Sequence, residues 1–503
     1  MNLPGLQELA GNRNGQGLSL LAGALLVAAF APFNWYWLAP FAPACLLLLW
    51  ETADARQAAR TGFIFGVGYF VAGTWWLYIS LNILGGLWPP LAILLMLVFV
   101  LALAVYIALT GYLTVRLSPA GGLVRWLIIF PAVWTVMEWL RGWFLSGFPW
   151  MSLGYSQAES MAGALAPVLG VYGVTWLLLL CAGLIVAALR LPARLTALPL
   201  AGLVLLGLLF YTLDGRDWTT PADEPLQVRL VQGAIPQQRK WLPEQLQPTL
   251  ELYRELSNIK DSPDLIVWPE AAVPALPFAV EDYLQELHEE LVDQDSQLFL
   301  GILTFDVDSG EFLNTLWAVG EEEGKYFKRH LVPFGEFFPV PDFVRHVLRL
   351  MNLPSEDISP GQAVQEPLFV KGVPVAPTIC YEIAYGSEQL SFFPQAQLLV
   401  NVSNDAWFGN TIAPHQHLQI NQFRAREAGR YMLRATNTGI TAVIDPAGKV
   451  IASAPQFEPG VVDAKVYPRD GLPPYLRFGN WLILSAASVL ILGGTFFGRR
   501  HSS

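Results

Sequence analysis

Residues 90–114 read PLAILLMLVFVLALAVYIALTGYLT, a stretch of 25 residues that carries no charge. About 20 apolar residues in a helix cross the roughly 30 Å hydrocarbon core of a bilayer, so this stretch is long enough to span a membrane. Seven other apolar runs predict further spans, near residues 17–33, 36–50, 61–82, 124–143, 165–189, 195–213 and 479–497. The fold class expected from them is a polytopic α-helical membrane protein with eight transmembrane helices.

The charged residues are concentrated in one part of the chain. Residues 1–213 contain eight arginines, no lysine and five acidic residues, whereas residues 214–477 contain 36 acidic and 20 basic residues. We therefore predict a seven-helix transmembrane domain at 1–213, a soluble domain at 214–477, and an eighth helix with a short tail at 478–503. The whole chain is 53% hydrophobic and 14% charged, with a net charge of −11. This composition excludes a disordered protein and argues against a nucleic-acid-binding one.

The loops between the predicted spans differ in their arginine content. Basic residues lie in alternate loops, at Arg13, Arg56, Arg60, Arg116, Arg125, Arg190 and Arg194, and Arg499 and Arg500 follow the last span. By the positive-inside rule these segments face the cytoplasm. Both chain termini are then expected to be cytoplasmic, and residues 214–477 to lie outside the cytoplasm.

Two charged residues lie near the end of a predicted span. Glu138 and Arg141 are three residues apart, so a helix places them on one face, where they can neutralise each other. A charge within a membrane often marks a functional site, but a structural pair at the membrane interface explains the same pattern. Both interpretations remain open at the level of sequence.

Residues 214–477 alternate between short β-rich runs and helical runs. The runs with strand composition are 227–232, 264–268, 297–303, 315–319, 373–379 and 397–402. Helical periodicity marks residues 244–259, 281–292 and 415–429, and residues 439–452 are typical of a hairpin with a turn at 445–448. The alternation favours an α/β or α+β layered fold.

Three residues at or near the ends of these runs could carry chemistry. Cys380 follows the run 373–379, where a rigid strand would present a nucleophile and the next backbone N–H could bind an oxyanion. Glu270 closes LIVWPE at 265–270, and we expect desolvation there to raise its pKa towards the range of a general base. Lys328 lies among aromatic residues and could place positive charge beside a thiolate or oxyanion. The ordinary alternatives are a buried cysteine, a solvated acid and a surface lysine.

Taken together, these residues match a known pattern. The chain resembles the nitrilase (carbon–nitrogen hydrolase) superfamily with its Glu-Lys-Cys triad, and within it the membrane-bound apolipoprotein N-acyltransferase family of Gram-negative bacteria. The resemblance covers nearly the whole chain. Its most specific motifs are residues 147–150, 153–157, 231–233 with Trp241, 333–336, 380–382, 401–409, 415–417 and 433–437.

The resemblance implies both a fold and a reaction. Residues 214–477 would form an inserted α/β nitrilase-like domain, an α-β-β-α sandwich, in the periplasm of a protein of the bacterial inner membrane. The enzyme would move an acyl chain from a phospholipid, preferentially the sn-1 chain of phosphatidylethanolamine, to the α-amino group of the N-terminal diacylglyceryl-cysteine of an apolipoprotein. Cys380 would be the nucleophile that forms a thioester, Glu270 the general base and Lys328 the oxyanion stabiliser. The enzyme is expected to be a monomer.

Other residues would support this reaction. Glu336 would orient Lys328, Glu382 matches a further acid of the family's site, and Tyr381 would offer its N–H to the oxyanion. Apolar segments at 271–280, 337–338, 343–351 and 407–408 could form arms that enter the membrane or gate the site, with core packing as the alternative. The expected substrate contacts are Trp241, Phe343, Leu348, Trp407 and Phe408.

No cofactor and no metal are expected. His415 and His417 are two residues apart, which on a helix points their rings in different directions. Two other functions remain open: a membrane-tethered nitrilase or amidase that cuts a small C–N substrate, and a transporter or lipid-handling scaffold with a sensor domain. The first would not need eight spans for a soluble substrate, and the second would not need the three catalytic residues.

Overall fold

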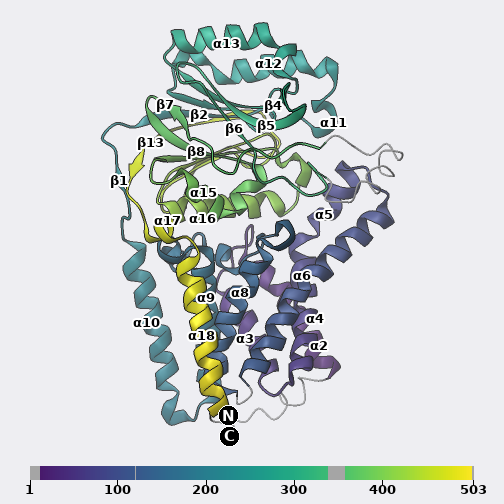
Figure 1. Ribbon diagram of the computed structural model, residues 1–503, viewed down its shortest axis with the longest axis vertical. Coiled ribbons are helices and arrows are strands. Elements are labelled where there is room, and N and C mark those ends of the chain that lie inside the picture. Colours follow the sequence, from purple (N-terminus) through teal and green to yellow (C-terminus); the bar gives the residue numbers. More distant parts are fainter. Residues whose placement is uncertain (1–11, 119–120, 338–356, 501–503) are drawn as a thin grey trace. The chain divides into compact units, whose positions relative to one another are not determined.

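The computed structural model describes residues 12–118, 121–337 and 357–500, with side chains up to residue 496. Contacts divide the chain into two compact units, whose elements are labelled in Figure 1. The helical unit comprises Met1–Asp217, Asn410–Glu427 and Pro473–Ser503, and the sheet unit comprises Trp218–Gly409 and Ala428–Leu472. The division expected from the sequence kept residues 410–427 in the soluble domain, whereas their contacts group them with the helical unit.

The helical unit is built from helices joined mostly by short connections. In chain order they are α2 (Arg13–Leu26), α3 (Leu38–Trp50), α4 (Ala55–Thr74), α5 (Trp76–Tyr78), α6 (Pro89–Leu117), α7 (Gly122–Val124), α8 (Phe130–Arg141), α9 (Ala166–Arg190), α10 (Ala197–Asp214), α16 (Ala413–Ala428), α17 (Pro474–Phe478) and α18 (Trp481–Arg500). The run at residues 90–114 lies wholly inside α6, as predicted.

Four helical segments of the described chain are long and apolar enough to cross a membrane. They are Pro89–Leu117, Gly122–Arg141, Met161–Arg190 and Ala193–Asp214, and a fifth is possible if Ala55–Thr74 and Trp76–Leu84, which bend by 52°, form one span. The eight spans expected from the sequence are therefore not reproduced. Two of the expected spans are the shorter apolar helices Leu38–Trp50 and Trp481–Phe496. At 1.5 Å per residue the 13 residues of Leu38–Trp50 extend about 20 Å, which is shorter than the hydrocarbon core.

Small residues let the long helices pack closely. A Cβ atom on Gly62 of α4 would lie 2.6 Å from the carbonyl oxygen of Ile107 in α6, and one on Gly66 would lie 2.8 Å from the Cα atom of Ala104. Distances this short mean that a larger residue at either glycine would push the helices apart. Close approach through small residues is the usual way in which helices associate in membranes.

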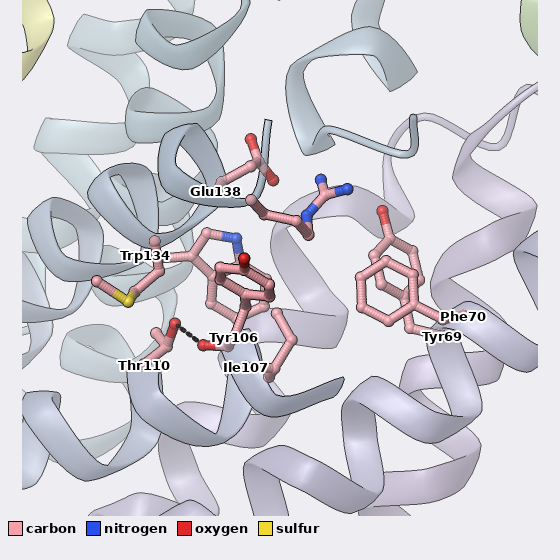
Figure 2. Close-up of a pocket in the computed structure, with 9 residues that line it drawn as sticks. Tyr69, Phe70, Tyr106, Ile107, Thr110, Trp134 and Glu138 are labelled. Carbon is pink, nitrogen blue, oxygen red and sulfur yellow. Dashed lines mark hydrogen bonds between the residues drawn. The ribbon is translucent and has the colours of Figure 1, made fainter. Parts of the chain in front are cut away.

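Glu138 and Arg141 are both buried at the end of α8, and each binds the chain that follows it. The Arg141 guanidinium donates to the carbonyls of Phe148 (2.5 Å) and Trp150 (2.7 Å). The Glu138 carboxylate accepts from the backbone N–H of Leu153 (3.0 Å) and the hydroxyl of Thr175 (2.6 Å). The two side chains line a small pocket (Figure 2). These contacts favour the structural interpretation of the pair. Besides any mutual neutralisation of their charges, the two side chains bind the backbone of residues 148–153.

Helix α16 explains why residues 410–427 belong with the helical unit. The carbonyl oxygen of the Gln416 side chain accepts hydrogen bonds from the indole N–H groups of Trp150 (2.8 Å) and Trp76 (3.3 Å). Near the other end of the helix, Glu427 accepts from the backbone N–H of Val171 (2.8 Å). The sequence predicted this helix correctly, but its polar residues gave no sign that they are buried against other helices.

The sheet unit contains two six-stranded sheets. One has the order β13-β2-β3-β4-β5-β6 and the other the order β12-β11-β10-β9-β8-β7. Their strands are β2 (Leu226–Gln232), β3 (Leu265–Val267), β4 (Gln297–Asp306), β5 (Glu311–Val319), β6 (Gly324–Phe327), β7 (Leu368–Val370), β8 (Val373–Ile379), β9 (Leu398–Ser403), β10 (Met432–Thr436), β11 (Ala442–Ile444), β12 (Val450–Ser453) and β13 (Gly460–Val466); β1 (Thr220–Pro221) pairs with β14 (Arg469–Asp470). Every strand predicted from the sequence is present, including the 439–452 hairpin, whereas β1, β6, β7, β10, β13 and β14 were not predicted.

Helices cover the first sheet on its outer face. In Figure 1, α12 (Pro243–Ser257) and α13 (Glu281–Asp293) lie together against the sheets, and the short helix α15 (Gly386–Gln389) lies on the opposite side. Apolar residues of α12 and α13, including Leu250, Leu287 and Leu291, join those of β3 and β4 in one buried cluster. Two stacked sheets between helices agree with the expected sandwich. Among the described residues of this unit, the short helix α15 lies on the face opposite α12 and α13.

Parallel pairing directs the ends of several strands to the same edge of the unit. Strands β2, β3 and β4 are parallel neighbours in one sheet, and β8, β9 and β10 are parallel neighbours in the other. Ligands of such sheets bind beyond the carboxyl ends of the strands. Glu270 follows β3, Cys380 follows β8 and Asn404 follows β9, so the topology gathers these residues.

Candidate active site

Cys380 occupies a strained turn between strand and helix. It comes directly after β8, starts the 3₁₀ turn Cys380–Ala384, and has a φ of +55°. This left-handed conformation is unfavourable for a residue with a side chain and is kept only when its surroundings fix it. The Asn401 amide supports the turn by donating to the Cys380 carbonyl (3.3 Å) and to the Thr378 hydroxyl (3.1 Å). The chain therefore holds the thiol at the end of a rigid strand, as the sequence predicted.

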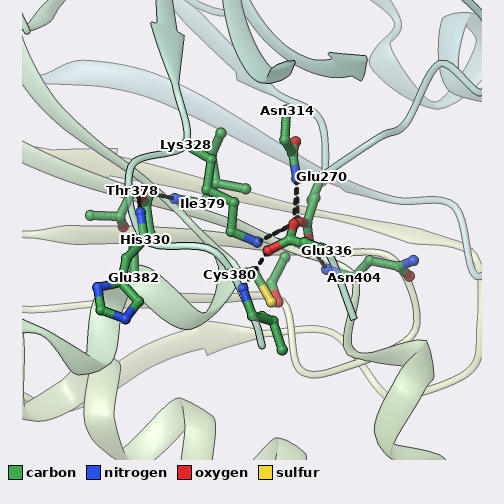
Figure 3. A network of polar contacts seen from close by, with 12 residues as sticks. Glu270, Asn314, Lys328, His330, Glu336, Thr378, Ile379, Cys380, Glu382 and Asn404 are labelled. Carbon is green, nitrogen blue, oxygen red and sulfur yellow. Dashed lines mark hydrogen bonds and ion pairs between the residues drawn. The ribbon is translucent and has the colours of Figure 1, made fainter. Parts of the chain in front are cut away.

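Glu270 is buried just beyond β3, with 7% of its surface exposed. One carboxylate oxygen accepts from the Asn314 amide (2.8 Å) and from Lys328 Nζ (3.1 Å), and the other accepts from the backbone N–H of Asn404 (2.8 Å). These contacts fix the orientation of the carboxylate. Figure 3 shows Cys380 beside the group formed by Glu270, Lys328 and Glu336.

Lys328 lies just past β6 and links two carboxylates. Its Nζ is 3.1 Å from Glu270 Oε1 and 2.8 Å from Glu336 Oε1, and the side chain is 1% exposed. Glu336 is held in turn by the backbone N–H of Val332, which donates to its other oxygen (2.8 Å). The contact between Glu336 and Lys328 is the one that the sequence analysis expected.

The charges of this cluster follow from burial and mutual attraction. Burial alone would raise the pKa of Glu270, but the Lys328 ammonium and the donated hydrogen bonds outweigh it and lower this pKa below the ordinary value. Our expectation of a raised pKa for Glu270 is therefore wrong, because the sequence could not reveal how many donors and cations surround the carboxylate. Burial lowers the pKa of Lys328, yet Glu270 and Glu336 raise it well above the usual value, so this lysine stays charged.

The nucleophile has the opposite preference. Burial, and then the neighbouring Glu270 carboxylate, raise the pKa of the Cys380 thiol, although Lys328 acts against them. The resting site consequently holds an ionised carboxylate, an ammonium and a neutral thiol. Such a thiol needs a base at the moment of attack, and the ionised carboxylate beside it is suited to that task.

Glu382 ties the cysteine turn to the lysine segment. It is buried, and it accepts from the backbone N–H groups of Ile379 (2.7 Å), Arg329 (2.5 Å) and His330 (3.1 Å) and from the Tyr326 hydroxyl (3.0 Å). These donors come from both sides of the site, next to Cys380 and next to Lys328. Its position therefore indicates a structural link between the two residues.

The aromatic residues expected near the substrate lie at different depths. Trp241 is 49% exposed and Trp407 is 42% exposed, whereas Phe408 and Tyr381 are half-buried. The Tyr381 hydroxyl accepts a hydrogen bond from Tyr385 (2.9 Å). Phe343 and Leu348, and with them the expected arm at 343–351, lie outside the described residues.

Residues 271–280, which follow Glu270, are partly packed in the core and partly exposed, so each of the two alternatives considered for this segment describes one part of it. Its beginning packs in the core, since Ala272 and Val273 are buried. Its middle contains Phe278, which is 72% exposed. The contrast places any membrane-entering or gating part of this segment around Phe278.

Sequence reasoning missed three polar residues of the site. Asn314 bonds to Glu270 from inside β5, Asn404 bonds to Glu270 through its backbone, and Lys240 donates to the Glu270 carbonyl (3.2 Å). Asn404 lies within the 401–409 motif, and Asn314 is a polar residue in the mostly apolar strand β5, so both carried a weak signal. Lys240 carried no such signal, because its burial is not visible in the sequence and most lysines lie at the surface.

Comparison with known proteins places the chain in a family. Residues 22–184 match the family described as apolipoprotein N-acyltransferase N-terminal domain, and residues 227–470 match carbon-nitrogen hydrolase. Proteins named apolipoprotein N-acyltransferase from Methylococcus capsulatus, Nitrosomonas europaea and Coxiella burnetii are 41%, 42% and 39% identical to it. These alignments cover 96%, 95% and 94% of this chain and 96%, 97% and 98% of those proteins.

The chain belongs to the apolipoprotein N-acyltransferase family. The family predicted from the sequence is thus confirmed, together with the carbon–nitrogen hydrolase fold of the sheet unit. Among solved structures, yeast Nit3 of the nitrilase superfamily matches with 19% identity and a TM-score of 0.38, covering 50% of this chain and 93% of its own. The two matched segments correspond to the two kinds of structure, with 22–184 in the helical unit and 227–470 around the sheets.

Proposed function

We propose that this chain is an acyltransferase of lipoprotein maturation that works through a thioester on Cys380. The donor would be a phospholipid, with the sn-1 chain of phosphatidylethanolamine preferred, and the acceptor the N-terminal diacylglyceryl-cysteine of an apolipoprotein. The observation that carries the proposal is the cluster of the buried Glu270 and Lys328 with the half-buried Cys380 in a chain of this family. Its ionised carboxylate can take the proton of the thiol, and its charged amine can stabilise the oxyanion.

The first half of the reaction would form the acyl-enzyme. Glu270 takes the thiol proton while Sγ of Cys380 attacks the ester carbonyl, and a tetrahedral oxyanion forms. The Lys328 ammonium and the backbone N–H of Tyr381 stabilise this oxyanion. The C–O bond of the ester then breaks, protonated Glu270 gives its proton to the departing alkoxide, and a lysophospholipid leaves.

The second half would consume the thioester. The amine of the acceptor attacks the thioester carbonyl, and Glu270 accepts the proton that the nitrogen loses. Collapse of the second oxyanion breaks the C–S bond, and the thiolate takes the proton back from Glu270. Two easier steps, the second with a thiolate as leaving group, replace one difficult direct transfer.

Neighbouring residues would keep this arrangement in place. Glu336 would orient Lys328, with which it makes a 2.8 Å contact, and Glu382 would fix the turn that carries Cys380. Trp241, Trp407 and Phe408 would contact the substrates, as would Phe343 and Leu348 from the segment outside the described residues. Apolar side chains suit the acyl chains of both substrates.

We extend the proposal to the membrane. The four or five apolar helical segments would span the bacterial inner membrane, and the helices Arg13–Leu26, Leu38–Trp50 and Trp481–Phe496 would enter it beside them, giving up to the eight spans expected from the sequence. The arginine-rich loops would face the cytoplasm with both termini, and the sheet unit would face the periplasm. A monomer suffices, because all proposed catalytic residues lie in one sheet unit.

The experiment that tests the function uses two labelled substrates. The purified full-length protein is incubated with phosphatidylethanolamine carrying a labelled sn-1 chain and with a diacylglyceryl lipopeptide. The expected product is a lipopeptide labelled on its amino group, and Cys380→Ser should abolish it. An amide or nitrile substrate that releases ammonia, with no label reaching the lipopeptide, would instead establish a hydrolase and overturn the proposal.

A further inference from the structure

Lys240 is a second buried lysine beside Glu270. It ends the short helix α11 (Gln237–Lys240) and is 2% exposed, whereas its neighbour Trp241 is 49% exposed. Its Nζ donates to the backbone carbonyl of Glu270 at 3.2 Å, which is its one hydrogen bond among the described residues. An ammonium with three N–H donors is expensive to bury with a single neutral acceptor. A purely structural position would be better filled by an apolar side chain.

The same short helix also reaches the Glu270 carboxylate. The Gln237 side chain accepts a hydrogen bond from the Asn404 amide (2.8 Å), and the backbone N–H of Asn404 donates to Glu270 Oε2 (2.8 Å). Asn437 donates to the Asn404 side chain as well (3.1 Å). The two ends of α11 therefore hold the backbone and the carboxylate of one residue.

Lys240 is the second cation beside Glu270. Glu270 and Glu336 are two carboxylates, and Lys328 is the one ammonium in contact with both. The Glu270 carboxylate contacts one ammonium, that of Lys328, and lies beside the neutral Cys380 thiol. Lys240 supplies the second positive charge. Burial lowers the pKa of Lys240 to about 8, while Glu270 acts to raise it, so the lysine is charged at neutral pH and below.

We infer that Lys240 is a positioning residue that holds Glu270 in place and keeps its carboxylate ionised. The Glu270 carbonyl fixes where the ammonium lies, and the charge of the ammonium opposes protonation of the carboxylate through space. The inference rests on the proposed role of Glu270 as the general base. It adds that the base depends on a lysine outside the Glu-Lys-Cys triad.

The test follows the pH dependence of the first half-reaction. The rate of thioester formation on Cys380 is measured by intact mass, with excess phosphatidylethanolamine in detergent, for the wild type and for Lys240→Met. Lys260→Met is the matched control, because Lys260 is exposed on the same unit. Lys240→Met should shift the acid limb of the profile to higher pH and reduce the rate most strongly below neutral pH, and the control should leave the limb in place.

Lys240→Arg provides a rescue with the charge retained. Its acid limb should stay close to that of the wild type, and thermal unfolding shows which variants are folded. If Lys240→Arg does not fold, the pH of the acid limb of Lys240→Met is sufficient to test the role of Lys240. An unchanged limb in folded Lys240→Met would overturn the role of Lys240. Absence of any acyl adduct on the wild type would instead overturn the proposed function, so the two failures are distinguishable.

Discussion

Glu138 in the helical unit and Glu270 in the sheet unit are both buried carboxylates with cations nearby, yet their neighbours differ. Glu138 binds a hydroxyl and a backbone N–H, and Arg141 beside it binds two carbonyls, so this pair joins α8 to the following segment and α9. Glu270 lies between two lysines and beside a thiol on a strained turn. Burial of a charged residue does not by itself show whether its role is catalytic or structural. The groups that surround the charge distinguish the two roles.

The same substitution in both places tests this difference, and the larger effect is expected in the sheet unit. Glu270→Gln keeps the shape of the side chain but removes the base that takes the thiol proton. The rate of lipopeptide acylation should fall by about 10²–10⁴-fold, the usual contribution of a general base. Thermal unfolding in detergent should change little. A Glu270→Gln enzyme with wild-type rates would contradict the assigned role.

Glu138→Gln is the counterpart in the helical unit. It weakens the hydrogen bonds that the carboxylate accepts from Leu153 and Thr175, and a hydrogen bond to a charged group contributes about 2 kcal/mol to stability. The unfolding temperature should fall, while the acylation rate of the protein that remains folded stays close to that of the wild type. A rate loss as large as that of Glu270→Gln, at unchanged stability, would move Glu138 into the catalytic group.

The pH profile of the wild type sharpens the comparison further. The Glu270 pKa lies below the ordinary value of a glutamate because Lys328 and the donated hydrogen bonds outweigh burial. Its base form is therefore present above that lowered pKa and is lost only as the pH falls through it. Thioester formation, followed in short exposures to acid, should persist below pH values at which an ordinary glutamate becomes protonated. An acid limb above neutral pH would contradict this charge state.

The smallest effect is expected at the edge of the site. Trp241 is half exposed, so Trp241→Ala should lower the free energy of unfolding by only about 1–2 kcal/mol. If its ring contacts the acyl chains, KM for the phospholipid should rise while kcat is retained. Lys260→Met again serves as the control, and equal KM values for Trp241→Ala and the wild type would remove Trp241 from the substrate contacts.

Much of this arrangement could be predicted from the sequence because it depends on local pattern. Apolar runs predicted strands β3 and β8, and the residues that follow them, Glu270 and Cys380, come together because parallel strands end at one edge. The shift of the Glu270 pKa could not be predicted, because its direction depends on Asn314, Lys328 and Lys240. These residues are distant from Glu270 in the chain, and nothing in the sequence shows that they lie beside it. The grouping of residues 410–427 with the helical unit could not be predicted for a similar reason, because their helical period does not reveal which unit buries them.

The central claim is that Cys380 carries the acyl chain as a thioester, and intact mass tests it most directly. The full-length protein is mixed with phosphatidylethanolamine of defined chains in the absence of an acceptor, and its mass is measured at neutral pH. The account predicts an increase equal to one fatty acyl group, which disappears on addition of a diacylglyceryl lipopeptide and never forms in Cys380→Ser. An active enzyme that shows no acyl adduct, or an adduct that persists in Cys380→Ser, would contradict it.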